Sequence, residues 1–129
     1  MASLLRKLGA RVTVAARKSS DLVWASLEGC DTVSLAEGDG VTVLAKGYDI
    51  IFNTIPQIVF HSEFIRILDR HTLIIELASS PGGIDIQASK ENKKKVLWGA
   101  SLPGKYAPKS AGAHIADSIS AILEKEVPL

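Results

Sequence analysis

The chain alternates between short apolar runs and segments in which apolar residues recur at three- and four-residue spacing. The apolar runs predict strands at residues 10–16, 32–35, 50–53, 72–77 and 96–98. The periodic segments predict helices at residues 1–8, 21–27, 62–68, 84–92 and 108–126. This alternation predicts an α/β domain spanning residues 1–129, with a doubly wound parallel sheet and helices on both faces.

The same periodicity predicts which side chains pack in the core and where helices begin. Ser20 is expected to cap the second helix, and Pro56 to lead into the third. Residues 36–46 fit either an extended piece or a helical turn, because glycines interrupt any longer helix there. The predicted packing positions are Leu4, Leu5, Leu8, Leu22, Trp24, Ala25, Phe64, Ile65, Leu68, Ala111, Ile115, Ser118, Ile119, Ile122 and Leu123.

The run at residues 50–52 ends abruptly at Asn53 and Thr54, and Pro56 follows. Such a run predicts a strand that is buried on both faces. Ligands of open parallel sheets bind beyond the carboxyl ends of the strands. Four strand ends carry polar or glycine-rich sequences, at residues 17–20, 53–56, 78–83 and 99–105. Together they predict a binding site along one edge of the sheet.

The composition argues against some classes of partner but does not select one function. The net charge of +1 gives no indication of a nucleic-acid or anionic-membrane partner. No apolar stretch is long enough to span a bilayer, and no signal peptide is visible. The single cysteine, Cys30, fits a reducing cytoplasm and is expected to be a small buried side chain. No pair of the three histidines has metal-ligand spacing, so no metal site is predicted.

Arg17 is the sharpest single candidate for cofactor recognition. In dinucleotide-binding folds an acid after the second strand binds the ribose, whereas an arginine there accommodates a 2′-phosphate. Here Arg17, Lys18 and Ser19 occupy that place and no acid precedes Asp21. The pattern favours NADP over NAD, with a solvated loop arginine as the alternative.

The residues of the other loops each fit two interpretations, one functional and one structural. Asn53 and Thr54 could bind ribose or nicotinamide groups, or cap the next helix. The glycines of the third and fourth loops allow close approach to a ligand, or form tight turns. Lys105 and Lys109 could bind a dicarboxylate substrate or be exposed, and Ser110 could be a cap or a phosphate contact. Glu76, inside an apolar strand, is either a structural carboxylate or a site residue.

Four segments together carry a resemblance to a known family. Residues 8–18, 52–56, 76–83 and 102–112 resemble the carboxyl-terminal nucleotide-binding domain of the dipicolinate synthase A subunit. The resemblance implies a Rossmann-like fold and an NADPH-dependent oxidoreductase. It further implies synthesis of dipicolinate from a dihydrodipicolinate-type precursor of the lysine pathway during sporulation, with the flavoprotein-like dipicolinate synthase B subunit as partner.

The resemblance and the loop positions together give the predicted site. No residue is assigned a catalytic role, and a homo-oligomer is compatible with the sequence. The predicted cofactor-binding residues are Arg17, Lys18, Ser19, Asn53, Thr54, Ile55, Pro56, Ala78, Pro103 and Gly104. The predicted substrate-binding residues are Lys105, Lys109 and Ser110.

One feature of the fold family is absent from the sequence. Dinucleotide-binding domains start with a strand and a G-x-G-x-x-G loop, whereas this sequence begins within the helix that should follow that loop. With strand order 3-2-1-4-5-6, the sheet should then be incomplete at its N-terminus, with two facing unpaired edges. We expect direct pairing across the gap, a strand from another chain, or poor stability, with residues 41–44 as a conceivable filler. The rival function is a non-catalytic Rossmann-like binding or oligomerisation module.

Overall fold

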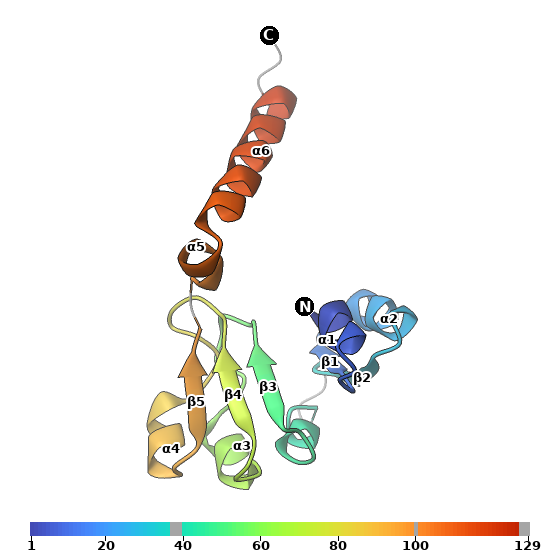
Figure 1. The fold of residues 1–129 in the computed structure, drawn as a ribbon. Helices are drawn as coiled ribbons and strands as arrows, with labels where there is room; N and C mark the ends of the chain where they lie inside the picture. Colours follow the sequence, from blue (N-terminus) through green and yellow to red (C-terminus); the bar gives the residue numbers. More distant parts are fainter. Residues whose placement is uncertain (37–39, 100, 127–129) are drawn as a thin grey trace.

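The computed structural model describes residues 1–36, 40–99 and 101–126. Helices and strands alternate along this chain, as the sequence predicts (Figure 1). Their bounds are α1 Ala2–Lys7, β1 Thr13–Ala16, α2 Ser19–Leu27, β2 Asp31–Ser34, the 3-10 helix η1 Thr42–Ala45, β3 Ile50–Asn53, α3 Ser62–Ile67, β4 Leu73–Glu76, α4 Ile86–Glu91, β5 Lys95–Trp98, α5 Leu102–Tyr106 and α6 Pro108–Glu126.

The described strands form two separate parallel sheets. One sheet pairs β1 with β2, and the other has the order β3-β4-β5. No described backbone pairing joins β1 to β3, so direct pairing across the expected gap does not occur. The fold is therefore α/β and Rossmann-like, with an incomplete sheet.

The hydrophobic core lies on one face of the three-stranded sheet. Ile51, Ile74 and Val96 share one level of its register and pack into this core. Phe64 and Ile65 of α3 cover them, and the ring centroids of Phe60 and Phe64 are 4.6 Å apart. The buried stripe predicted for this helix is confirmed, because Phe64, Ile65 and Leu68 are all buried.

Side chains from η1 and the two-stranded sheet reach the same core. Leu44 and Ala45 of η1 are buried in it, and Ala15, Val33 and Leu35 pack against it. These contacts connect the two sheets through side chains rather than backbone pairing. Cys30 is buried, as predicted.

Residues 41–44 do not fill the gap as a strand. Thr42–Ala45 form the helical turn η1, and Leu44 turns into the core. The prediction of a local filler is therefore wrong. Burying Leu44 and Ala45 in the core removes apolar surface from water, which favours the helical turn.

The first two helices differ from prediction in their caps and packing. α2 begins at Ser19 with Lys18 as N-cap, and no side chain caps it, so the prediction that Ser20 is the cap is wrong. Leu4 and Leu8 are exposed, and 70% of Trp24 is exposed. Periodicity indicated an apolar face here, but no described element covers these three side chains.

The carboxyl-terminal region also differs from prediction. Residues 102–106, expected to lie within a loop, form the short helix α5. The long helix α6 is confirmed and extends away from both sheets (Figure 1). Its predicted packing positions Ile115 and Ile119 are exposed, while the side chains of Ile122 and Leu123 lie outside the described residues. Among the described helices, none has the length and hydropathy needed to cross a bilayer.

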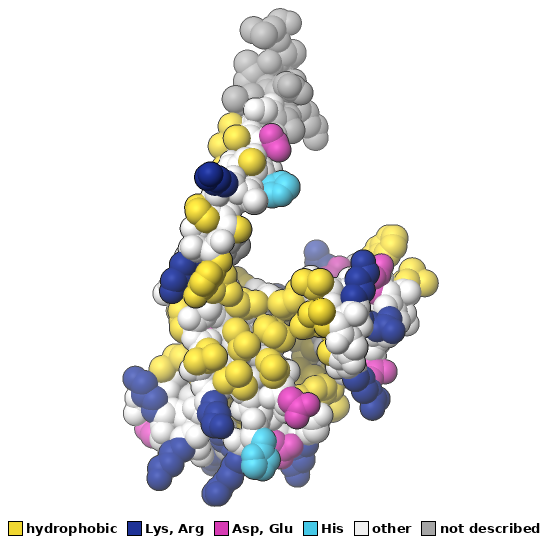
Figure 2. All heavy atoms as spheres, in the orientation of Figure 1, with side chains coloured by type: hydrophobic (Ala, Val, Ile, Leu, Met, Phe, Trp, Pro, Cys, Tyr) yellow, Lys and Arg dark blue, Asp and Glu magenta, His cyan; other side chains and the backbone are white. Residues whose placement is uncertain are grey.

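Strand β3 is not buried on both faces. Asn53 at its end is buried, but 46% of Ile50 is exposed, so the prediction of burial on both faces is wrong. Leu97 of β5 is also exposed. Apolar side chains gather over the three-stranded sheet and toward the two-stranded one on the face shown in Figure 2. This surface is continuous with the space between the sheets.

Candidate functional site

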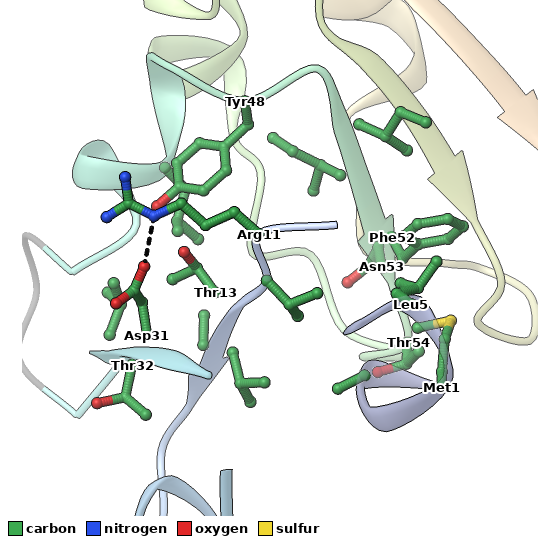
Figure 3. A pocket seen from close by; sticks show the side chains of 18 of the residues that line it. Met1, Leu5, Arg11, Thr13, Asp31, Thr32, Tyr48, Phe52, Asn53 and Thr54 are labelled. Atoms are coloured by element: carbon green, nitrogen blue, oxygen red, sulfur yellow. Dashed lines mark hydrogen bonds and ion pairs between the residues drawn. The ribbon is translucent and has the colours of Figure 1, made fainter. Parts of the chain in front are cut away.

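A cavity of about 920 Å³ occupies the space between the two sheets. It is lined by residues of β1, β2 and β3, by the start of α1, and by residues in and next to η1 (Figure 3). Its apolar lining includes Leu5, Val14, Leu44, Phe52 and Phe60. The cavity lies where the sequence predicts facing unpaired strand edges.

Strands β1 and β3 run in the same general direction along this cavity. Arg11 and Tyr48 mark the end at which both strands begin, and Asn53 and Thr54 lie toward the other end, beside Met1 (Figure 3). The carboxyl ends of parallel strands are where ligands of α/β sheets bind. The Met1 and Thr54 end is therefore the candidate ligand-binding end.

A buried carboxylate organises this end of the three-stranded sheet. Glu76 is fully buried at the end of β4, directly opposite Asn53 of β3. Its two oxygens accept hydrogen bonds from Asn53 Nδ2 at 2.8 and 3.0 Å, from Ala78 N at 2.9 Å and from Gly83 N at 3.0 Å. A buried carboxylate is tolerated only with such partners. Of the two alternatives left open for Glu76, this bonding identifies the structural one.

Asn53 connects this carboxylate to the loop that follows β3. Its Nδ2 also donates to the carbonyl oxygen of Ile55 at 3.0 Å, and its Oδ1 accepts from Ile55 N at 3.2 Å. An amide nitrogen carries two hydrogens, and both are used inside the protein. Asn53 therefore shapes the tip of β3, and its side chain has no hydrogen left to donate to a ligand.

Two glycines make room for this network. Gly82 has φ +82°, and a Cβ there would lie 2.8 Å from the Trp98 ring. A Cβ on Gly83 would lie 2.3 Å from Asn53 Nδ2 and 2.6 Å from the carbonyl oxygen of Ile55. The close approach allowed by these glycines is thus to the protein's own Asn53 and Trp98.

The remaining residues predicted near β1 and β3 differ in exposure. Arg17 and Lys18 follow β1 and are exposed, and Ser19 is the exposed first residue of α2. Thr54 and Ile55 line the cavity, whereas the exposed Pro56 does not. Arg17 also lies outside the cavity lining. It belongs to the same edge of the fold, because it follows the carboxyl end of β1.

The predicted positions in the last two loops are not brought to the cavity. Ala78 is buried and its N–H is bonded to Glu76. Pro103 and Gly104 lie in α5, and the side chain of Pro103 lies outside the described residues. Lys105 Nζ lies 5.4 Å from the ring centroid of Tyr106. Lys109 and Ser110 are exposed at the start of α6, so the substrate positions stay a prediction.

The opposite end of the cavity carries an ion pair that the sequence did not reveal. Arg11 Nε donates to Asp31 Oδ2 at 2.8 Å, which links the starts of β1 and β2. This hydrogen bond, together with the charge of Asp31, raises the pKa of the Arg11 guanidinium above its ordinary value. The pair is exposed, so it gives this end of the cavity a polar mouth. Its members lie twenty positions apart in the sequence, and no local pattern connects them.

Sequence analysis did not predict the hydrogen bonds of Glu76 to Asn53, Ala78 and Gly83, although the sequence contains an indication of them. A carboxylate inside an apolar strand, followed seven residues later by a glycine, indicates a buried charge that needs backbone donors. Among the described residues no group of three or more His, Cys, Asp and Glu side chains is placed to hold a metal ion.

Comparison with known proteins gives a consistent result. No protein-family model matches the chain. It is 35% identical over 116 residues to the A subunit of dipicolinate synthase from Bacillus subtilis, which covers 90% of this chain and 38% of that protein. The chain thus spans well under half the length of this relative.

Two solved structures of such A subunits have a similar fold. The A subunit of dipicolinate synthase from Bacillus halodurans matches with a TM-score of 0.83 and 33% identity, over 95% of this chain and 41% of that one. Its counterpart from Bacillus subtilis matches with a TM-score of 0.84 and 34% identity, over 96% and 41%. The predicted resemblance is confirmed, and the chain is a homologue of a part of the dipicolinate synthase A subunit.

Proposed function

We propose that this chain is the NADP-binding part of an oxidoreductase related to dipicolinate synthase. The observation that carries the proposal is the position of Arg17, exposed directly after β1 at the carboxyl edge of the sheets. Homology to the dipicolinate synthase A subunit supports a nucleotide cofactor of this kind.

Charge favours the phosphorylated cofactor. Among the described residues Arg17 has no ion-pair partner, so its guanidinium is available to a phosphate. Lys18 stands next to it, and the first acid beyond, Asp21, lies inside α2. A guanidinium matches a phosphate with two parallel hydrogen bonds, and a lysine adds a point charge. An acid that would bind the 2′-hydroxyl of NAD is missing from this turn.

The chain's own residues would hold and orient the cofactor. Arg17, Lys18 and Ser19 would bind the adenosine phosphate, and Thr54 and Ile55 would border the nicotinamide at the end of β3. The Glu76 and Asn53 network would keep that border rigid, because it fixes the backbone of Ile55. The bound cofactor would supply the hydride chemistry.

The activity of the whole protein is part of the same proposal. We propose a role in the cytoplasmic synthesis of dipicolinate during sporulation, with a dicarboxylate substrate near Lys105, Lys109 and Ser110. The B subunit of the synthase would be the partner, since the relative is named as the A subunit.

One observation favours a second candidate. Both side-chain hydrogens of Asn53 are used inside the protein and none is left for a ligand, which favours a non-catalytic Rossmann-like module. Cofactor binding separates these two functions directly.

The test is calorimetric titration of the 129-residue chain with NADPH and with NADH. We expect NADPH to bind more tightly than NADH, and Arg17→Ala to weaken NADPH binding at least tenfold without changing NADH binding. Arg66→Ala is the matched control, because Arg66 is an exposed arginine of α3 outside the cavity lining. We expect low absolute affinity, since the sequence contains no G-x-G-x-x-G loop.

Equal binding of both cofactors, unaffected by Arg17→Ala, would contradict NADP specificity. Absence of binding by either cofactor in the folded chain would favour the non-catalytic module.

A further inference from the structure

We propose that the end of the three-stranded sheet at which β4 and β5 begin is a docking surface for an acidic segment of a partner protein. Basic side chains gather there, in and beside the turns that precede these two strands. We call this set the basic edge, and its members are Arg66, Arg70, Lys90, Lys93, Lys94 and Lys95. It lies at the opposite end of the strands from Asn53 and Glu76, so the inference does not depend on cofactor binding.

The two turns of the basic edge lie side by side, because β4 and β5 are adjacent parallel strands. Lys95 is directly opposite Leu73 in their register. Lys94 Nζ donates a hydrogen bond to the carbonyl oxygen of Leu68, which connects one turn to the other. Neighbouring strands lie about 4.8 Å apart, so cations from both turns can contact one extended segment. Figure 2 shows Lys and Arg side chains gathered at the end of the molecule where α3 and α4 lie in Figure 1.

The charge of the basic edge is not neutralised within the described chain. All its side chains except Lys94 are exposed, and among the described residues these exposed ones take part in no hydrogen bond or ion pair. The helix dipoles of α3 and α4 account for a cation in the last turn of each, at Arg66 and Lys90. This effect ends with the last turn and does not explain the cations beyond it. Since the like charges repel one another, an anionic partner would relieve that repulsion.

The turn after α4 is ordered before any partner binds. The N–H of Lys94 donates to the carbonyl oxygen of Ser89 at 2.9 Å, and the N–H of Lys93 donates to that of Lys90 at 3.1 Å. Lys93 has φ 51°, the left-handed conformation in which glycine commonly follows a helix. A lysine therefore stands where glycine would fit the backbone better. An ordered turn loses little conformational entropy on binding, so its cations are ready for a partner.

The composition of the same turns favours a protein segment over a nucleic acid or a membrane. Residues 66–71 and 90–95 contain no Phe, Tyr or Trp that could stack on bases. Ile67 is the exposed large apolar side chain among them, which is too little to anchor the edge in a bilayer. The carboxylates of Asp69 and Glu91 interrupt the cations. A uniformly anionic surface would meet these carboxylates too, whereas a polypeptide can place its own carboxylates at the cations alone.

The experiment measures the binding of a fluorescent acidic peptide to the 129-residue chain by anisotropy. The peptide has about ten residues of alternating glutamate and serine, because an extended chain of that length is longer than the spacing of two strands requires. We expect saturable binding that weakens as salt is added, since salt screens exposed charges. The same peptide with glutamine in place of glutamate is the control, and it should bind at least tenfold more weakly.

Two double variants with equal loss of charge locate the binding surface. Lys93→Gln combined with Lys95→Gln removes two cations of the basic edge. Lys7→Gln combined with Lys18→Gln removes two exposed lysines at α1 and at the start of α2. We expect the first variant to weaken binding of the acidic peptide at least tenfold, and the second to change it less than twofold.

A single variant separates binding from folding. Lys93→Gly should raise the thermal unfolding midpoint, because glycine adopts positive φ without strain. It should also weaken binding of the acidic peptide at least threefold, because one cation of the basic edge is lost. A lysine that is merely solvated would leave peptide binding unchanged.

Three results would overturn the inference. The first is no saturable binding of the acidic peptide to the folded chain at low salt. The second is an equal loss of binding in the two double variants, which would mean that the peptide responds to net charge and not to the basic edge. The third is tighter binding of a short DNA duplex, or of vesicles of phosphatidylcholine and phosphatidylserine, at equal concentration of negative charge. If the Lys93 and Lys95 variant abolished that binding, the partner would be a nucleic acid or a membrane.

Discussion

Asn53 and Glu76 lie opposite each other at the ends of β3 and β4, with Asn53 Nδ2 2.8 Å from Glu76 Oε1. The contact joins two strands whose tips border the candidate site. It also holds the loop after β4, because Ala78 and Gly83 donate to the same carboxylate. Stability and site geometry therefore depend on the same few atoms.

Replacing Glu76 with glutamine tests this dependence. Glutamine keeps the shape but has one acceptor oxygen, so its amide group would face an N–H donor of Ala78 or Gly83. We expect Glu76→Gln to lower the free energy of unfolding by about 2 kcal/mol, a magnitude typical of lost hydrogen bonds to a buried charge. Urea denaturation followed by circular dichroism measures it.

Glu63→Gln is the control for this change, because Glu63 is an exposed residue of α3. Its effect should stay within about 0.5 kcal/mol, as for most surface substitutions. Equal stability of the two variants would mean that the buried network contributes nothing to the fold.

A methyl group at Gly83 should disturb the same region by crowding. The added Cβ would overlap Asn53 Nδ2 and the carbonyl oxygen of Ile55, and the second of these is backbone that cannot turn aside. We expect Gly83→Ala to destabilise by about 1–3 kcal/mol, the usual range for overpacking. The thermal unfolding midpoint is the measurement.

Gly104→Ala provides the matched comparison, since a Cβ at this position in α5 meets no atom within 4 Å. Alanine is a better helix former than glycine, so this variant should be neutral or slightly more stable. A Gly83→Ala protein as stable as Gly104→Ala would show that the loop can move away from Asn53.

The core around α3 should respond strongly to truncation. Ile65 is fully buried against the three-stranded sheet. We expect Ile65→Ala to cost about 2–5 kcal/mol, because the lost methyl groups leave a cavity that the surroundings fill only in part. Ile119→Ala, on the exposed side of α6, should change stability by less than about 0.5 kcal/mol. Equal losses in the two variants would place Ile119 in a packed interface.

Helix α6 should exchange its amide hydrogens faster than the sheet does. It extends away from both sheets, and Ile115 and Ile119 remain exposed. Local opening costs little free energy where few apolar contacts hold an element. In native-state hydrogen exchange, the amides of α6 should therefore open well before those of β4. Equal protection of α6 and β4 would contradict the extended position of this helix.

Sequence reasoning predicted the order and type of most elements because each depends on local pattern. Apolar runs marked the strands, and Phe64, Ile65 and Leu68 marked a buried helix face that the structure confirms. Sequence reasoning failed where the burial of a side chain depends on contact with another element. Trp24 and Ile119 have the spacing of packed residues, but no described layer covers them. Periodicity predicts that a helix has an apolar face, but it does not predict whether another element packs against that face.

The sequence predicted where polar side chains end the strands, but not which groups those side chains contact. Asn53 was singled out because it ends the apolar run of β3, and ligands bind beyond the carboxyl ends of parallel strands. The carboxylate that engages Asn53 lies on another strand, twenty-three residues away, and only the register brings them together. The Arg11 and Asp31 pair escaped detection for the same reason. The cofactor and substrate roles remain predictions.

The gap between the sheets also bears on how the chain unfolds. Side chains around η1 connect the two sheets, and no described backbone ladder crosses between them. Cooperative unfolding of a small domain requires that every part lose its partners together. Here the β1 and β2 unit can detach while β3, β4 and β5 keep their own core. We therefore expect a broad, multi-step melting curve for the chain rather than one sharp transition.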